Sequence, residues 1–118
     1  MPLSCHDHAA VEARVEYVEL DDLIDLARVL LGDPPPTRDV GLLGSAAARP
    51  QASAFGHDAY PDVVTKAAAL LQSVVCNHAL VDGNERLGWL ATAVFLELNG
   101  LDASEIADDD VYDLVIWV

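Results

Sequence analysis

The amino-acid sequence predicts an all-α domain with one short β-hairpin. Several segments place apolar residues three and four positions apart, which is the period of an amphipathic helix. Proline and glycine separate these segments, and a strand pattern is absent outside residues 51–55. Helical periodicity is also missing from residues 1–15, which we expect to be a disordered tail. Residues 16–118 are therefore expected to form a single domain.

Two helices are predicted in the first half of this domain. The first runs from Leu20 to Leu31, and Gly32 follows as its C-cap residue. Three consecutive prolines, residues 34–36, then forbid a helix because proline lacks the amide donor. Thr37 or Asp39 can cap a short second helix, which the following residues Arg49-Pro50 end.

The hairpin and two long helices make up the rest. Residues 51–55, followed by Gly56, predict an extended hairpin or flap. Pro61 suits the first position of a helix that runs to Asn77, since its missing N–H is not needed there. A second long helix is expected from Asn84 to Leu98, and a last one from Asp108 to Val118.

The charge of the chain limits the partners it can bind. Its 20 acidic and 6 basic residues give a formal net charge of −14. So acidic a surface repels nucleic acid and anionic membranes, and it favours a basic partner or simply aids solubility. No apolar stretch is long enough to span a bilayer. Two cysteines are too few for a disulfide framework, so a cytoplasmic location is expected, with Cys76 as a small buried side chain.

The segment from residue 78 to residue 86 has the composition of a phosphate-binding loop. Gly83 allows a ligand to approach the backbone, and the first N–H groups of the helix at Asn84 have no helical acceptor. Those N–H groups, the helix dipole and Arg86 form an anion site. Asp82 would repel phosphate unless Mg²⁺ lies between them, and His78 can take a proton from a hydroxyl.

This constellation is typical of phosphoryl or nucleotidyl transfer, in which positioning and charge neutralisation do most of the work. A purely structural interpretation is also open. Asp82-Gly83 is a common turn, Asn84 a common helix cap and Arg86 a common surface residue.

The segment also resembles the motif of the Fic/Doc family, His-x-Phe-x-(Asp/Glu)-(Gly/Ala)-Asn-(Gly/Lys)-Arg. It matches that motif at His78, Asp82, Gly83, Asn84 and Arg86. Similarity to the Doc branch extends over residues 18–118. It includes the prolines at 34–36, the run of residues 60–71 and residues 91–100.

The resemblance implies a compact Fic-like helical bundle with a flap before the motif that holds a target in extended form. It implies a toxin of a toxin–antitoxin pair that transfers the terminal phosphate of ATP to a hydroxyl of a translation factor, elongation factor Tu. His78 would be the general base, Asp82 would hold Mg²⁺, and Gly83, Asn84 and Arg86 would bind phosphate. A cognate antitoxin would be the partner. Flap residues Arg49 and Gln51 would contact the target, or would bond only within their own turn.

Three positions depart from the family motif. Leu80 replaces the aromatic residue that anchors the loop in the core. Trp89 stands where the AMP-transferring branch has a second arginine, which makes AMP transfer the poorer match, and its place in the core or at an interface is open. Glu85 stands where Doc has lysine, and a carboxylate there disfavours an anion.

Glu85 leaves two hypotheses. It can weaken nucleotide binding and leave a catalytically impaired binding module, or it can pair with Arg86 or face solvent, so that activity survives. The chain also stops soon after Trp117, where members of the Doc branch usually have another helix, so we expect that helix to be missing.

Overall fold

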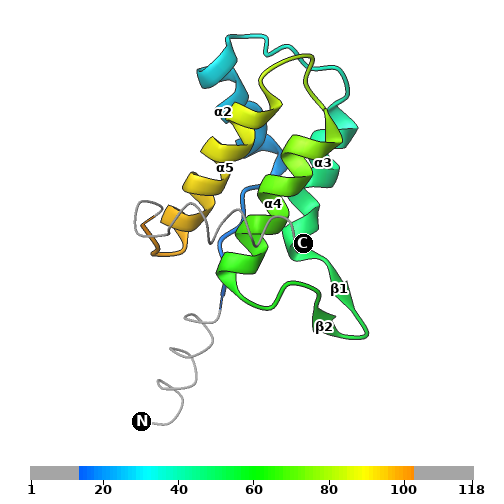
Figure 1. Ribbon diagram of the computed structural model, residues 1–118, viewed down its shortest axis with the longest axis vertical. Coiled ribbons are helices and arrows are strands. Elements are labelled where there is room, and N and C mark those ends of the chain that lie inside the picture. Colours follow the sequence, from blue (N-terminus) through cyan, green and yellow to red (C-terminus); the bar gives the residue numbers. More distant parts are fainter. Residues whose placement is uncertain (1–13, 103–118) are drawn as a thin grey trace.

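The computed structural model describes residues 14–102, and it shows an all-α bundle with a single two-stranded hairpin (Figure 1). The predicted last helix and most of the predicted N-terminal tail lie outside these residues. Val15, which was assigned to the tail, already packs against the core. In chain order the elements are α2 (Leu20–Leu31), α3 (Val40–Ala48), a 3-10 turn (Arg49–Gln51), β1 (Ser53–Ala54), β2 (His57–Asp58), α4 (Val63–Asn77) and α5 (Asn84–Leu98).

Short polar side chains set where the helices begin. Asp39, one of the two predicted caps, accepts a hydrogen bond from the Gly41 N–H at 2.9 Å and starts α3. Asp62 accepts from the Thr65 N–H at 2.8 Å and starts α4. The prediction that Pro61 is the first residue of this helix is therefore wrong by two positions, because Asp62 caps the chain after the proline.

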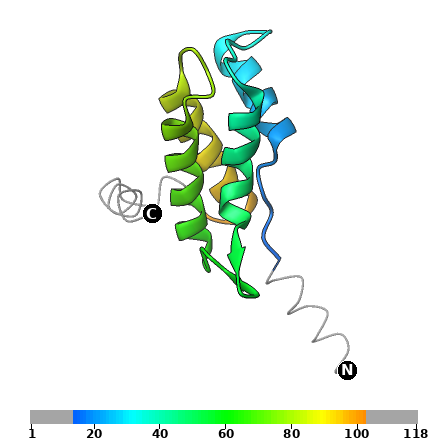
Figure 2. The same cartoon turned by 90° about the vertical axis from the view of Figure 1, so that its right-hand side faces the viewer.

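Helices α4 and α5 pack against each other at the centre of the bundle, and α2 and α3 complete the core (Figures 1 and 2). A Cβ atom at Gly88 would lie only 2.9 Å from Val75 Cγ2 and 3.1 Å from Leu71 Cδ1, so the two helices need a glycine at their crossing. Phe95, Leu70 and Leu23 are among the fully buried side chains of this core.

The predicted hairpin exists, but it spans residues 53–58 instead of 51–55, and it lies at the far end of α4 from the motif. Its two strands pair antiparallel, Ser53 with Asp58 and Ala54 with His57. Figures 1 and 2 both show the hairpin at one end of α4 and the loop between α4 and α5 at the other. A helix of 15 residues separates them by about 22 Å at 1.5 Å per residue. The expected flap therefore does not border the motif.

The exposure of Cys76 and Trp89 decides two further predictions. Cys76 is exposed, so the prediction of a buried side chain is wrong: it sits on the outer side of α4, although its sequence neighbours are apolar. Trp89 is 45% exposed and lies outside the core. Within residues 14–102, none of the helices has the length and apolar character needed to cross a bilayer.

Candidate functional site

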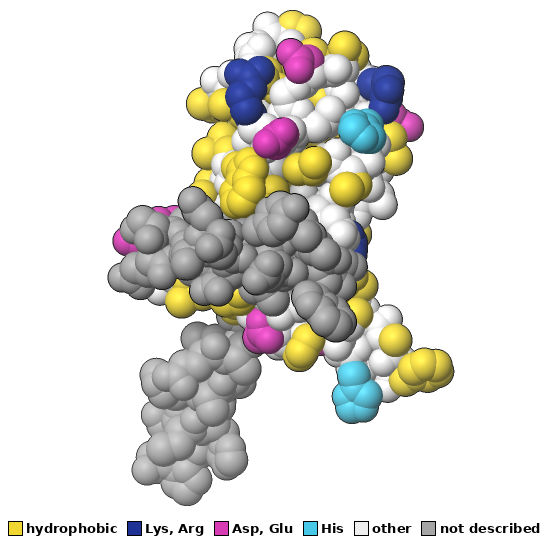
Figure 3. All heavy atoms as spheres, in the orientation of Figure 1, with side chains coloured by type: hydrophobic (Ala, Val, Ile, Leu, Met, Phe, Trp, Pro, Cys, Tyr) yellow, Lys and Arg dark blue, Asp and Glu magenta, His cyan; other side chains and the backbone are white. Residues whose placement is uncertain are grey.

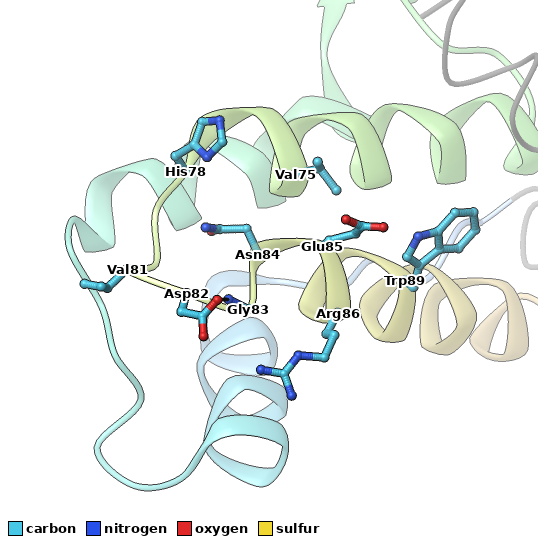
Figure 4. A pocket seen from close by; sticks show the side chains of 9 residues that line it. All are labelled: Val75, His78, Val81, Asp82, Gly83, Asn84, Glu85, Arg86 and Trp89. Carbon is cyan, nitrogen blue, oxygen red and sulfur yellow. Dashed lines mark hydrogen bonds between the residues drawn. The ribbon is translucent and has the colours of Figure 1, made fainter.

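An open pocket of about 580 Å³ lies where α4 ends and α5 begins. The whole motif segment faces this pocket apart from its buried anchor residues. Its lining residues are Val75, His78, Val81, Asp82, Gly83, Asn84, Glu85, Arg86 and Trp89. The structure thus brings together every site residue predicted within the motif (Figure 4).

Two buried residues anchor the motif loop in the hydrophobic core. Ala79 and Leu80 are each 1% exposed, so Leu80 fills the core position expected for the motif's aromatic residue. The side chain of Asn84 closes the loop above it: its Oδ1 accepts from the Leu80 N–H at 3.0 Å, and its Nδ2 donates to the Leu80 carbonyl at 2.9 Å. Asn84 therefore acts first as a brace of the loop, with one amide hydrogen left for a ligand.

A neighbouring segment, residues 36–39, holds the loop from the side. The N–H groups of Arg38 and Asp39 donate to the Ala79 carbonyl, and the Val81 N–H donates to the Pro36 carbonyl at 2.7 Å. The Arg38 guanidinium also donates to the carbonyl of His78. The proline-rich connection after α2, rather than the hairpin, is therefore the segment that borders the motif.

The start of α5 has the properties of an anion site. Gly83, its N-cap residue, has a φ of 87° and provides no side-chain cap. A Cβ atom at Gly83 would lie 2.7 Å from a Leu31 methyl group, so this position needs glycine for both conformation and space. Within residues 14–102, the N–H groups of residues 84–86 find no protein acceptor. They face the pocket at the positive end of the helix dipole.

Charged side chains divide the pocket into two sides (Figure 4). Asp82 and Arg86 lie on one side of the start of α5, where the Gly83 N–H donates to Asp82 Oδ1 at 2.9 Å. Glu85 points to the other side, toward Val75 and Trp89. All three charged side chains are exposed, and no ion pair of Glu85 or Arg86 occurs in the described part of the chain. Glu85 was expected either to pair with Arg86 or to face solvent if activity survives. In the structure it does not pair with Arg86, and its side chain faces solvent.

His78 is the C-cap of α4 and has a left-handed backbone conformation with φ 52°. Such a conformation is uncommon for a residue with a side chain. The backbone bonds of the neighbouring Ala79 and the Arg38 bond to the His78 carbonyl hold this geometry. The imidazole remains exposed at the pocket, where it can meet a hydroxyl.

The comparisons with known proteins agree with this geometry. The model of the Fic/DOC family matches residues 17–96, more than half of the chain. The chain belongs to the Fic/DOC family. A relative, Toxin Doc of Mycolicibacterium smegmatis, is 49% identical over 96 residues, which cover 81% of this chain and 72% of the relative. No solved structure matches the chain significantly. The family assignment and the fold class expected from the sequence are both confirmed.

The two expected target-binding residues of this Fic/DOC chain are not part of the pocket. Arg49 lies in the 3-10 turn, where its Nε donates to the Tyr60 hydroxyl at 3.0 Å and its Nη1 to Ser73 Oγ at 3.1 Å. Gln51 donates to Glu19 Oε1 at 2.6 Å. Both side chains thus bond to residues far along the chain, in α4 and at the start of α2, so the alternative of bonding only within their own turn is wrong. Contact of Arg49 and Gln51 with a target stays a prediction.

Sequence reasoning missed two cations with clear positions in the structure. Arg38 donates a hydrogen bond to the carbonyl of His78. Its position shortly after three prolines was the one sequence feature that pointed to this bond. Lys66 is 1% exposed within α4, where its Nζ lies 3.2 Å from Asp58 Oδ2 and 3.3 Å from the Pro50 carbonyl. A single lysine among the alanines of a buried helix face was a readable signal that this charge has a partner.

The residues present fit a magnesium ion only if a phosphate accompanies it. Within residues 14–102 no three His, Cys, Asp or Glu side chains gather as a metal site. Asp82 is a single exposed carboxylate beside the anion site, with one oxygen bonded to the Gly83 N–H. Mg²⁺ often takes just one or two protein carboxylates and completes its shell with water and phosphate oxygens.

Proposed function

We propose that this chain is the toxin of a toxin–antitoxin pair and transfers a phosphate from ATP to a hydroxyl of a translation factor such as elongation factor Tu. The observation that carries the proposal is the uncapped start of α5, with Arg86 beside it. An uncapped helix start and a guanidinium without an ion pair among residues 14–102, both in one open pocket, are suited to the phosphates of a nucleotide. The name of the related Toxin Doc supports the toxin role, which implies a cognate antitoxin.

Each motif residue has one task in this proposal. The N–H groups at the start of α5 and the Arg86 guanidinium bind and orient the phosphates. His78 accepts the proton of the attacking hydroxyl. The hydroxyl oxygen then bonds to the terminal phosphorus of ATP, while the bond from that phosphorus to the nucleoside diphosphate breaks. Asp82 would hold Mg²⁺, which neutralises phosphate charge when bound. Gly83 and Asn84 keep the loop in the shape that these contacts require.

Growth of a bacterial culture tests the toxin role. Induction of the chain in Mycolicibacterium smegmatis is expected to arrest growth and protein synthesis, whereas His78→Ala is expected to leave growth normal at equal expression. The His78 side chain is exposed, so its removal should not affect folding. Equal arrest by both forms would contradict a catalytic toxin, and normal growth with both would contradict the toxin role.

Glu85 supports a second candidate, a binding module with impaired transfer. Its carboxylate lines the same pocket as Arg86 and has no described ion-pair partner. A carboxylate near phosphate costs affinity, although solvent reduces the effect at an exposed position. In Figure 4 Glu85 points away from Arg86, so its cost to phosphates bound beside Arg86 is small.

Calorimetric titration with ATP and Mg²⁺ separates the two candidates. We expect the wild-type chain to bind, Glu85→Lys to bind within about threefold of it because Glu85 is exposed and points away from Arg86, and Arg86→Ala to bind about tenfold more weakly. Binding by Glu85→Lys together with no detectable binding by the wild type would favour the impaired module. Equal binding by wild type and Glu85→Lys would show that Glu85 does not limit the site.

A further inference from the structure

The pocket contains a second, chemically distinct part on the side away from Arg86. Glu85 and Trp89 are four residues apart on α5, so their side chains share one face of the helix about 6 Å apart. Val75 of α4 lies opposite them (Figure 4). Trp89 is 45% exposed and Glu85 is exposed, so an acidic group and an aromatic ring are both open to a ligand. We call Val75, Glu85 and Trp89 the acidic shelf.

We propose that the acidic shelf binds an arginine or lysine side chain of the protein substrate, within two residues of the hydroxyl that is modified. This inference rests on the proposed function, because it names a specificity element of the same site. A guanidinium can stack on the Trp89 ring while it donates two hydrogen bonds to the Glu85 carboxylate. The negative charge of Glu85 and the net charge of −14 both attract a basic segment.

The position of the shelf agrees with this occupant. Val75 lies on α4 about one turn, roughly 5 Å, before His78, where the substrate hydroxyl must sit. One residue of extended chain spans about 3.3 Å, so a hydroxyl at His78 places its near neighbours over the shelf. Figure 3 shows acidic, basic and histidine side chains together at this end of the molecule, beside a hydrophobic patch.

Phosphate groups are a poor match for the shelf. Glu85 repels them, and Arg86 with Asp82 offers a phosphate and magnesium site on the opposite side of the start of α5. A nucleobase could stack on Trp89, but it would leave the charge of Glu85 without a counter-charge. A basic side chain satisfies both groups, and on that ground we prefer it.

Peptide binding tests the proposal without depending on transfer. The probes are blocked hexapeptides with one threonine and with arginine, lysine, alanine or glutamate within two residues of it. Trp89 fluorescence of the full chain with Trp117→Phe, together with calorimetry, reports binding. We expect the arginine peptide to bind at least tenfold more tightly than the alanine peptide, with lysine between them and glutamate weakest.

Two variants that each remove one negative charge distinguish a direct contact with Glu85 from attraction by the overall charge of the protein. Glu85→Gln is expected to reduce the affinity for the arginine peptide about tenfold, whereas Glu97→Gln, an exposed change at the other end of α5, should leave it within about twofold. Trp89→Leu should weaken binding about threefold, because it removes the ring and keeps an apolar side chain.

Three results of these binding measurements would overturn the proposal. Equal affinity for arginine and alanine peptides, or equal losses in Glu85→Gln and Glu97→Gln, overturns the proposal. It is also overturned if Glu85→Gln and Trp89→Leu weaken binding of magnesium ATP and leave peptide binding unchanged, since the shelf would then hold the nucleoside. Selective arginine binding without any transfer to the bound threonine would contradict the proposed function and leave the acidic shelf in place.

Discussion

Single residues explain why the motif loop keeps its shape before any ligand arrives. The amide of Asn84 satisfies both the N–H and the carbonyl of Leu80, while the Leu80 side chain is buried beneath. Arg38 fixes the carbonyl of His78, and Gly83 provides a backbone conformation that a larger residue would strain. These contacts leave the functional groups of His78, Asp82 and Arg86 exposed, so the pocket is preorganised.

Asp62, the cap of α4, gives a pH-dependent prediction at the residue scale. The backbone and side-chain hydrogen bonds from Thr65 lower the pKa of Asp62 below its usual value of 3.8. A group with a depressed pKa in the folded state stabilises the protein above its unfolded pKa and loses that contribution as the pH falls. Asp62→Ala is therefore expected to lower the free energy of unfolding by about 1 kcal/mol at neutral pH.

Urea unfolding at several pH values measures this effect. The stability difference between wild type and Asp62→Ala should be constant at neutral pH and should shrink as the pH falls below about 4. Glu97→Ala, which removes an exposed carboxylate near the end of α5, serves as a charge-matched comparison. A difference that grows toward low pH would contradict the cap assignment.

At the scale of elements, the crossing of α4 and α5 positions the two halves of the site. His78 comes from the end of α4, and the anion site comes from the start of α5, so their separation depends on how closely these helices pack. Gly88 permits that approach because Val75 and Leu71 occupy the space beside it. The connection at residues 36–39 then fastens the loop between the helices.

Gly88→Ala is expected to destabilise the protein by about 1–3 kcal/mol, because the new methyl group would overlap Val75 and Leu71 and separate the helices. Gly44→Ala in α3 is the matched control. A Cβ atom there would meet only Leu20 Cδ2 at 3.8 Å, so better helix propensity should raise stability by up to about 1 kcal/mol. Thermal unfolding measures both variants, and equal effects would contradict the close-crossing account.

Helix positions follow from the sequence more directly than spatial neighbours do. Apolar periodicity and the cap Asp39 locate the helices to within two residues, because those signals are local. Asn84, read as a common helix cap, is instead the first residue of α5, and Gly83 is its N-cap. The place of the hairpin is set by the length and direction of α4, which no motif encodes. Arg38 contacts His78 across 40 positions of sequence, and such a tertiary bond leaves no periodic trace.

Within the candidate site, residue type predicted which side chains gather but not what each one bonds to. Asn84 was expected to bind phosphate, and its amide mainly holds Leu80. Glu85 looked like a defect in an anion site, and its direction in Figure 4 separates it from Arg86. Side-chain direction at the start of a helix depends on the surrounding packing, which the sequence alone does not specify.

On the scale of the whole molecule, the pocket and the hairpin lie at opposite ends. One end holds the pocket, with Arg86, Arg38 and His78 close to the motif in a chain that has only six lysines and arginines. The other end holds the hairpin, which Lys66 attaches to α4 through Asp58. The 15 residues of α4 separate the hairpin from the pocket.

The intact mass of elongation factor Tu, after incubation with this chain, ATP and Mg²⁺, tests the central claim most directly. We predict that the factor gains the mass of one phosphate with the wild-type chain and that its mass does not change with His78→Ala. A gain equal to AMP would show transfer of the nucleotide instead of its terminal phosphate. An unchanged mass with wild type, under conditions where ATP binding is saturated, would contradict the claim that this pocket transfers phosphate to that factor.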